Sequence, residues 1–138
     1  MNGTHTTAMT LRRSATSGGP YEDPFGYCRA VRIGDHVAVA GTVAVDDEGN
    51  PIAPGDMYAQ TTAILGIIER ALADVDAAMT DVVRTRSFLT DIGQWEAFGR
   101  AHGEVFRTIK PVATAVEVNG LIGDGIVVEI EVDAIVTE

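Results

Sequence analysis

The sequence predicts an α+β fold, with one mixed β-sheet and two helices packed on the same face of it. Short runs of alternating β-branched residues are typical of strands, whereas two longer segments repeat apolar residues every three to four positions, as helices do. The order is strand, strand, strand, helix, strand, helix, strand, strand, which favours helices on one face of the sheet. The 138 residues suit a single domain, 1–138, and residues 1–10 are expected to form a mobile tail.

Three strands are expected before the first helix, within 9–16, 27–33 and 36–45. Gly34 and Asp35 separate the last two of these and suit a tight hairpin turn. The segment 18–26 carries two prolines and three glycines, so it is predicted to be an irregular loop. A second loop is expected at 46–56.

The first helix is predicted to begin at Met57, with Asp56 as its N-cap. One continuous apolar face is formed by Ile64, Ile67, Ile68, Ala71, Leu72 and Val75. A strand at 81–91 follows, and Asp91 and Gln94 then have the spacing of a capping box for the second helix. The apolar stripe of that helix consists of Trp95, Phe98, His102, Val105, Phe106 and Ile109.

The last two strands lie within 110–136, on either side of a glycine-rich turn. The final strand places three carboxylates on one face, because side chains two positions apart point the same way. These are Glu129, Glu131 and Asp133. Arg84 and Arg86 share a face of their own strand, and cross-strand pairing with the carboxylates contributes about 0.2–1 kcal/mol per pair. For Glu131 and Asp133 the simplest interpretation is a charged stripe towards solvent or a subunit rim.

The strand that begins near Pro111 is apolar or small on both of its faces. Val112, Thr114, Val116 and Val118 alternate there with Ala113, Ala115 and Glu117. Neither set resembles a fully solvated surface. We therefore expect another subunit to cover the sheet face that the helices leave free.

Composition excludes several classes of protein. The formal net charge of −10 disfavours nucleic-acid binding. No apolar run approaches the roughly 18 residues of a membrane span, and the first residues lack the apolar stretch of a secretory signal, so we expect a cytoplasmic protein without a membrane partner. Cys28 is either a half-buried strand residue or a reactive thiol. No Cys and His spacing indicates a metal site, and no cofactor motif is present.

Two further features are candidate ligand contacts. His102 lies on an apolar stripe, where a hydrogen-bonded core or interface role is usual, although beside a cleft it can act as an acid or base. Gly41 and Thr42 lie in "AGTVAV", whose small residues allow a ligand to approach the backbone. These features alone do not identify a reaction.

Three segments resemble, in order and spacing, the Rid or YjgF family of imine and enamine deaminases. They are "GYCRAVRIGDHVAVAGTVAV", "DVVRTRSFLTDIGQWEAFGRAHGEVF" and "KPVATAVEVNGLIGDGIVVEIEVDAI", which together span residues 27–136. The resemblance implies a chorismate-mutase-like fold and a homotrimer with ligand clefts between subunits. It also implies hydrolysis of a reactive small-molecule imine or enamine by water, with release of ammonia and without a cofactor.

The resemblance assigns roles to individual positions. Tyr27 matches a tyrosine of the family's cleft, and Gly41 matches a glycine whose backbone lines it. Glu129 matches the acidic residue that positions the attacking water, so Glu129 and Tyr27 are the expected catalytic residues. Ala40 and Ala115 stand where the deaminases have a serine and a cysteine.

The main departure from the family is Ala113. The deaminases have an arginine here, in "PxR[ST]", which grips the substrate carboxylate with two N–H groups. This chain has "PVAT", ending at Thr114. Its activity on 2-imino acids is therefore in doubt, and either Arg29 or Arg32 is a possible substitute clamp.

Three functions follow from the resemblance. The first is hydrolysis of an imine-type or enamine-type metabolite that lacks the usual carboxylate. The second is a non-enzymatic small-molecule-binding or regulatory trimer. The third is ribonuclease activity, an older name for the family, which the acidic composition disfavours. In each case the loop at 18–26, with Tyr21 and Phe25, is expected to reshape the cleft entrance.

Overall fold

The computed structural model describes residues 11–137, so the tail expected at 1–10 lies outside the described residues. Within this range six strands form one mixed sheet in the order β1-β2-β3-β6-β4-β5. The strands are β1 (Arg12–Ala15), β2 (Ala30–Ile33), β3 (His36–Thr42), β4 (Val82–Leu89), β5 (Val112–Glu117) and β6 (Val128–Ile135). β4 and β5 are parallel and the other neighbours are antiparallel.

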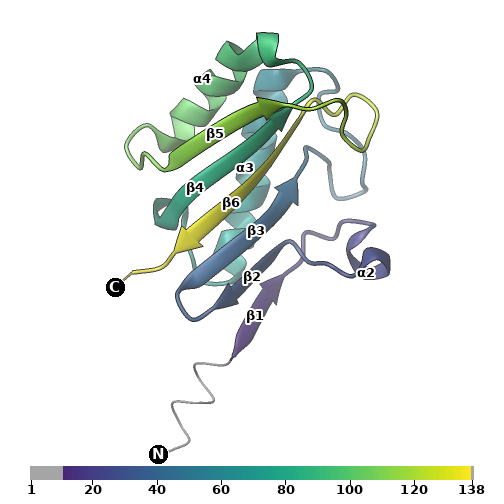
Figure 1. The fold of residues 1–138 in the computed structure, drawn as a ribbon. Coiled ribbons are helices and arrows are strands. Elements are labelled where there is room, and N and C mark those ends of the chain that lie inside the picture. Colours follow the sequence, from purple (N-terminus) through teal and green to yellow (C-terminus); the bar gives the residue numbers. More distant parts are fainter. Residues whose placement is uncertain (1–10, 138) are drawn as a thin grey trace, which may run out of the picture.

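Both long helices lie behind the sheet in Figure 1, and the face towards the viewer is uncovered. The helices are α3 (Met57–Asp74) and α4 (Trp95–Phe106). We call the uncovered side the open face. The mixed sheet with two helices on one face is the predicted architecture, and the order of the long elements is also as predicted. No helix in the described part of the chain is long and apolar enough to cross a membrane.

The N-terminal strands meet in the predicted hairpin. Ile33 pairs with His36, which leaves Gly34 and Asp35 as a two-residue turn. Gly34 has φ of 62°, a conformation that glycine adopts without the steric cost of a side chain. The loop at 18–26 differs from the prediction, because it contains a one-turn helix, α2 (Glu22–Phe25).

The core lies between the sheet and α3. Asp56 caps α3 as predicted, by accepting a hydrogen bond of 3.0 Å from the Ala59 N–H. The predicted apolar face of this helix is buried throughout, and it packs on the inward side chains of β3 and β6.

The start of α4 departs from the prediction. Asp91 accepts from the Gly93 N–H and initiates a 3₁₀ turn, η2 (Ile92–Gln94), while α4 itself has no side-chain cap. The predicted stripe covers the later part of the helix, because Phe106 is buried whereas Trp95 is 59% exposed. A second 3₁₀ turn, η1 (Met79–Asp81), precedes β4.

Candidate active site

The sequence-predicted site residues fall into two groups on opposite faces of the sheet. The first group comprises Tyr27, Gly41 and Glu129, and the second comprises Ala113, Ala115 and His102. On β6, Val128 and Ile130 are buried beneath the helices, so Glu129 between them projects from the open face. In the second group Ala113 and Ala115 lie on β5, the edge strand next to β4, and His102 lies on α4.

A β-bulge brings Gly41 against Glu129. Val39 pairs with Val132 and Thr42 pairs with Ile130, so β3 has one residue more than β6 between these pairs. A bulge of this kind bends the strand locally and is frequent beside active sites. A Cβ atom added at Gly41 would overlap the Glu129 carboxylate, so a larger residue here would force the Glu129 side chain to move.

Arg29 stabilises the bulge through a hydrogen bond to the backbone of Gly41. Its Nη1 donates to the Gly41 carbonyl at 2.7 Å and lies 3.4 Å from the Thr42 hydroxyl. Its Nη2 forms a salt bridge of 3.3 Å with Glu22. Its Nε donates to the Ser17 hydroxyl at 3.1 Å. The arginine therefore joins the bulge of β3 to the loop that carries α2.

Glu22 is the buried partner that neutralises Arg29. It is 4% exposed, and Arg29 is 7% exposed. The Glu22 carboxylate also accepts from Thr16 Oγ1 at 2.6 Å, from Ser17 Oγ at 2.8 Å and from the Gly19 N–H at 3.2 Å. Burial alone would raise the pKa of Glu22, but these hydrogen bonds together lower it below the ordinary value of 4.5.

Glu129 has no salt bridge among the described residues. Burial raises its pKa above the ordinary value of 4.5, the charge of Arg29 opposes this rise, and the charge of Glu131 adds to it. A carboxylate of raised pKa beside an open surface is a suitable general base.

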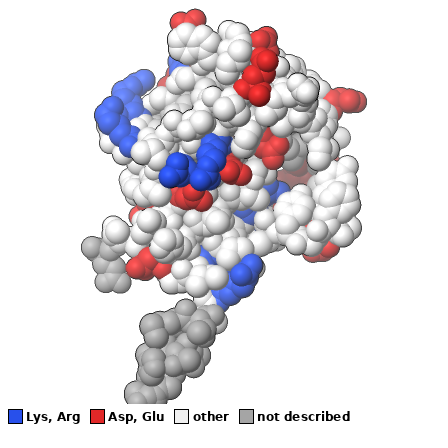
Figure 2. Space-filling model, viewed as in Figure 1, with Lys and Arg blue, Asp and Glu red and all other residues white. Residues whose placement is uncertain are grey.

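The other two carboxylates of β6 are paired as the sequence indicated. Arg86 lies 3.3 Å from both Glu131 and Asp133, and Arg84 lies 3.6 Å from Asp133. Figure 2 shows acidic and basic side chains meeting in the middle of the open face. These pairs are partly exposed, so they contribute little to stability and leave the stripe close to electrically neutral.

Exposed aromatic side chains occur in the first group and on the loop that carries α2. Tyr27 is 43% exposed, and the guanidinium carbon of Arg29 lies 5.6 Å from the centre of its ring. Tyr21 and Phe25 stack on one another with ring centres 5.2 Å apart, and both are exposed. The loop is thus fixed by Glu22 and presents its rings outward.

The residues of the second group lie at the β5 edge of the sheet, on the side that the helices cover. Ala113 pairs with Thr85 and Ala115 pairs with Ser87, so both alanines project towards the helix side. His102 Nε2 shares a hydrogen bond of 3.0 Å with Thr85 Oγ1, and burial lowers the pKa of His102. The ring of His102 also packs between Phe98 and Phe106, as expected for a structural histidine.

The remaining candidates have clear positions. Thr114 pairs with Arg86 and therefore projects from the open face. Thr42 is buried, and its hydroxyl donates to the Ala40 carbonyl at 2.7 Å. Arg32 donates to the Val75 and Asp76 carbonyls at the end of α3, so its guanidinium is engaged away from Glu129.

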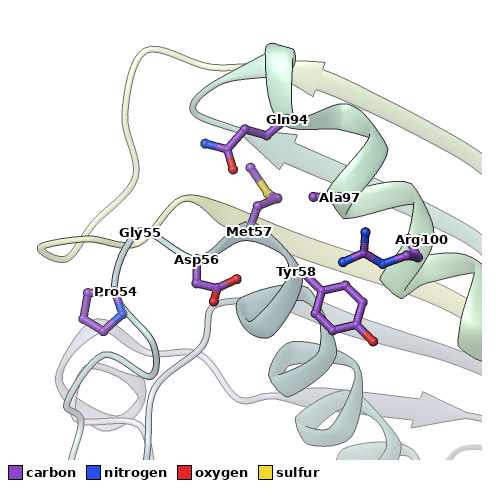
Figure 3. A pocket seen from close by; sticks show the side chains of 8 residues that line it. All are labelled: Pro54, Gly55, Asp56, Met57, Tyr58, Gln94, Ala97 and Arg100. Carbon is purple, nitrogen blue, oxygen red and sulfur yellow. The ribbon is translucent and has the colours of Figure 1, made fainter.

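A separate hollow lies between the starts of α3 and α4. In Figure 3 the Arg100 side chain lies over the ring of Tyr58, with a distance of 4.4 Å from the guanidinium carbon to the ring centre. None of the predicted site residues lines this hollow. Within residues 11–137 no three His, Cys, Asp or Glu side chains come close enough together to hold a metal ion.

Sequence reasoning missed Glu22. It lies in a loop between two prolines, where acidic residues are usually solvated, and neither helix nor strand periodicity applies to it. The available signal was Arg29, which falls in the predicted strand 27–33 beside mainly apolar residues, since an arginine that becomes buried there requires an acidic partner.

Known proteins share this architecture. The sequence model of the family described as "Endoribonuclease L-PSP" matches residues 22–136. An uncharacterised protein of Streptomyces coelicolor is 40% identical over 129 residues, which is 93% of this chain and 94% of that protein. A RutC family protein of Pyrococcus abyssi is 34% identical over 113 residues, 81% of this chain and 87% of its own length.

Solved structures agree with these sequence matches. Rv2704 of Mycobacterium tuberculosis, a member of the YjgF/YER057c/UK114 family, superimposes with a TM-score of 0.83 at 44% identity and covers 91% of this chain and 100% of its own. The YjgF gene product of E. coli superimposes with a TM-score of 0.76 at 25% identity, over 88% of this chain and 95% of its own.

The contact between Gly41 and Glu129 predicts a coupled pair of substitutions. Gly41→Ala should destabilise the native protein by about 1–3 kcal/mol, because the new methyl group displaces the carboxylate. In a Glu129→Ala background the same substitution should lower the free energy of unfolding by much less. Urea denaturation of the four proteins measures the coupling, and equal costs in the two backgrounds would show that the residues are not in contact.

The buried ion pair predicts a pH-dependent stability. Because the pKa of Glu22 is lowered on folding, its ionised form stabilises the protein fully above pH 4.5, and this contribution is lost as the pH falls below that value. Glu22→Gln should cost about 3–5 kcal/mol at pH 7, because it leaves Arg29 without its partner. Urea denaturation at pH values from 7 down to 3 should show that the difference in the free energy of unfolding between the native protein and Glu22→Gln becomes smaller. A constant difference would contradict the assignment, and Glu48→Gln in an exposed loop is the control.

Proposed function

The chain belongs to the YjgF/L-PSP family, also called the Rid or RutC family, and from this premise we propose that it hydrolyses a reactive imine or enamine in clefts between the subunits of a homotrimer. One observation carries the proposal. Glu129 is a half-buried carboxylate that forms no salt bridge within residues 11–137, and it lies against the backbone of Gly41 at the edge of an exposed surface.

The chemistry requires a base beside a bound water. Glu129 orients the water and accepts its proton as the oxygen forms a bond to the imine carbon, and the electron pair of the C=N bond moves to nitrogen. Protonated Glu129 then returns this proton to the nitrogen of the resulting carbinolamine. The C–N bond breaks as the hydroxyl oxygen forms the C=O bond and gives its proton to the Glu129 carboxylate, and ammonia leaves a carbonyl product. An enamine enters the same route after protonation at carbon. The raised pKa of Glu129 makes it able both to take and to return this proton. Tyr27, which is exposed, would hydrogen-bond the ligand through its hydroxyl.

A cleft between subunits would unite the two groups of residues. In one chain the sheet separates Glu129 from Ala113, Ala115 and His102, so neither group forms a complete pocket. The edge strand β5 is exposed along its whole length, with Val112 at 58% and Val116 at 43%. An apolar edge of this kind favours burial against another chain.

Ala113 makes ordinary 2-imino acids poor substrates. A methyl group cannot supply the two-pronged contact with a carboxylate, and its absence should weaken binding by about 2–4 kcal/mol, or roughly 30- to 1000-fold. Arg29 does not replace it, because its N–H groups are directed to Glu22, Ser17, Gly41 and Thr42. The substrate is therefore proposed to lack the α-carboxylate.

Ribonuclease activity, which the family description mentions, receives no support from the site. RNA binding depends on basic residues along a surface, whereas this chain has a net charge of −10 and its open-face arginines are paired with carboxylates.

The hydrolysis rate of 2-iminopropanoate tests the proposal. An amino-acid oxidase generates the imine in situ, and semicarbazide traps what remains. The native protein should be slow, and Ala113→Arg should gain roughly 30-fold or more, because the clamp is restored. Adding Glu129→Gln to that variant should lower the rate by about 10²- to 10⁴-fold. Inactivity of both the native protein and Ala113→Arg would favour the non-enzymatic binding function instead.

The subunit arrangement predicts a measurable mass. Sedimentation equilibrium should give three times the chain mass of 14.6 kDa. Val116→Asp on β5 should dissociate the assembly, because it places a charge on a surface that the trimer buries. Thr62→Asp, on the solvent side of α3, is the matched control and should leave the mass unchanged. A monomeric native protein would contradict the proposed cleft.

A further inference from the structure

The charges around the first group are balanced except at Glu129. Arg29 carries a positive charge close to this site, but its side chain is 9% exposed and Glu22 forms its salt bridge. The pair is neutral as a whole. The ionised carboxylate of Glu129 consequently remains as an uncompensated negative charge that borders the open face.

The charged stripe next to Glu129 does not supply a free cation. Arg86 lies between Glu131 and Asp133, and Arg84 lies beside Asp133, so two arginines face two carboxylates. Both of these arginines are already held by the acids of β6. An anionic ligand at Glu129 would therefore meet repulsion without a compensating donor of full charge.

The edge strand β5 contains no lysine or arginine. The six residues of β5, "VATAVE", contain one charged side chain, that of Glu117, and it is acidic. The Glu117 carboxylate accepts a hydrogen bond of 2.9 Å from the Ile92 N–H, which holds it at the start of η2. If a second copy closes the cleft with β5, the strand itself brings mainly small and apolar side chains towards Glu129 and contributes no positive charge.

From this balance we infer that the Glu129 site binds the protonated imine of an amine, a cation without a carboxylate, rather than the imine of an α-amino acid. The inference rests on the proposed function for its choice of an imine as the ligand. The preference of the site for a cation over an anion does not depend on that function. An iminium ion, C=NH₂⁺, presents N–H donors and a positive charge to a carboxylate acceptor. The reaction class that supplies such a substrate is the oxidation of a primary amine to its imine.

Binding of two stable probes tests the inference without requiring turnover. Benzamidinium is a planar cation that carries a C=NH₂⁺ group, and benzoate is a planar anion of nearly the same shape. Titration of the native protein at neutral pH should show benzamidinium binding about 10- to 100-fold more tightly than benzoate. Heteronuclear NMR reports both affinities and the residues that respond.

Two variants separate the site from the overall acidity of the protein. Glu129→Gln should abolish the preference for benzamidinium, and it should fold, because it removes a charge whose burial is unfavourable. Glu131→Gln removes the same charge two residues away on the same strand, from a carboxylate that Arg86 already pairs. That control should keep the preference within about twofold.

Four outcomes would overturn the inference: tighter or equal binding of benzoate, no binding of either probe at millimolar concentration, a preference that survives Glu129→Gln, or an equal loss in Glu131→Gln. The last of these would assign the preference to net charge. Failure of the proposed hydrolysis is distinguishable, because a protein that prefers benzamidinium through Glu129 and hydrolyses no imine keeps the charge selectivity and lacks the reaction.

Discussion

The buried ion pair between Glu22 and Arg29 fixes the geometry on which the candidate site depends. The bulge in β3 leaves Gly41 without a paired residue on β6, and a carbonyl that no ladder bond satisfies needs another donor. Arg29 supplies that donor, and Glu22 makes the burial of its charge tolerable while tying it to the aromatic loop. One guanidinium therefore sets the position of the bulge, the backbone that contacts Glu129, and the surface beside Tyr27.

The order of strands in the sheet has a second consequence. β6 runs through the middle, between β3 and β4, so its carboxylates lie on a broad open face. β5 lies at the outer edge and turns Ala113 and Ala115 to the helix side. A single chain thus divides the residues that the family resemblance assigns to one cleft. The simplest way to unite them is a neighbouring copy whose edge strand reaches the Glu129 side, which would also bury the exposed valines of β5.

The long elements were predictable because they follow strong periodic patterns. The face of α3, its Asp56 cap and the Gly34–Asp35 turn all appear as expected, and the shared face of Glu129, Glu131 and Asp133 follows from strand alternation. Structural details that follow no periodic pattern in the sequence were not predictable. The Glu22–Arg29 pair joins the short helix α2 to the residue before β2, and the bulge is a single added residue. The exposure of Trp95 depends on where α4 begins rather than on its apolar stripe.

The central claim is that one site is built from two copies of the chain, and subunit mixing tests it directly. Glu129→Gln and Ala113→Trp proteins would each be inactive in ligand binding, one through loss of the carboxylate and the other through a blocked edge strand. Mixed trimers formed by joint refolding would contain interfaces with an intact Glu129 from one chain and an intact Ala113 from the next. The account predicts that mixing restores part of the benzamidinium binding. Mixed trimers that bind no better than the separate variants would place all of the determinants within one chain and contradict it.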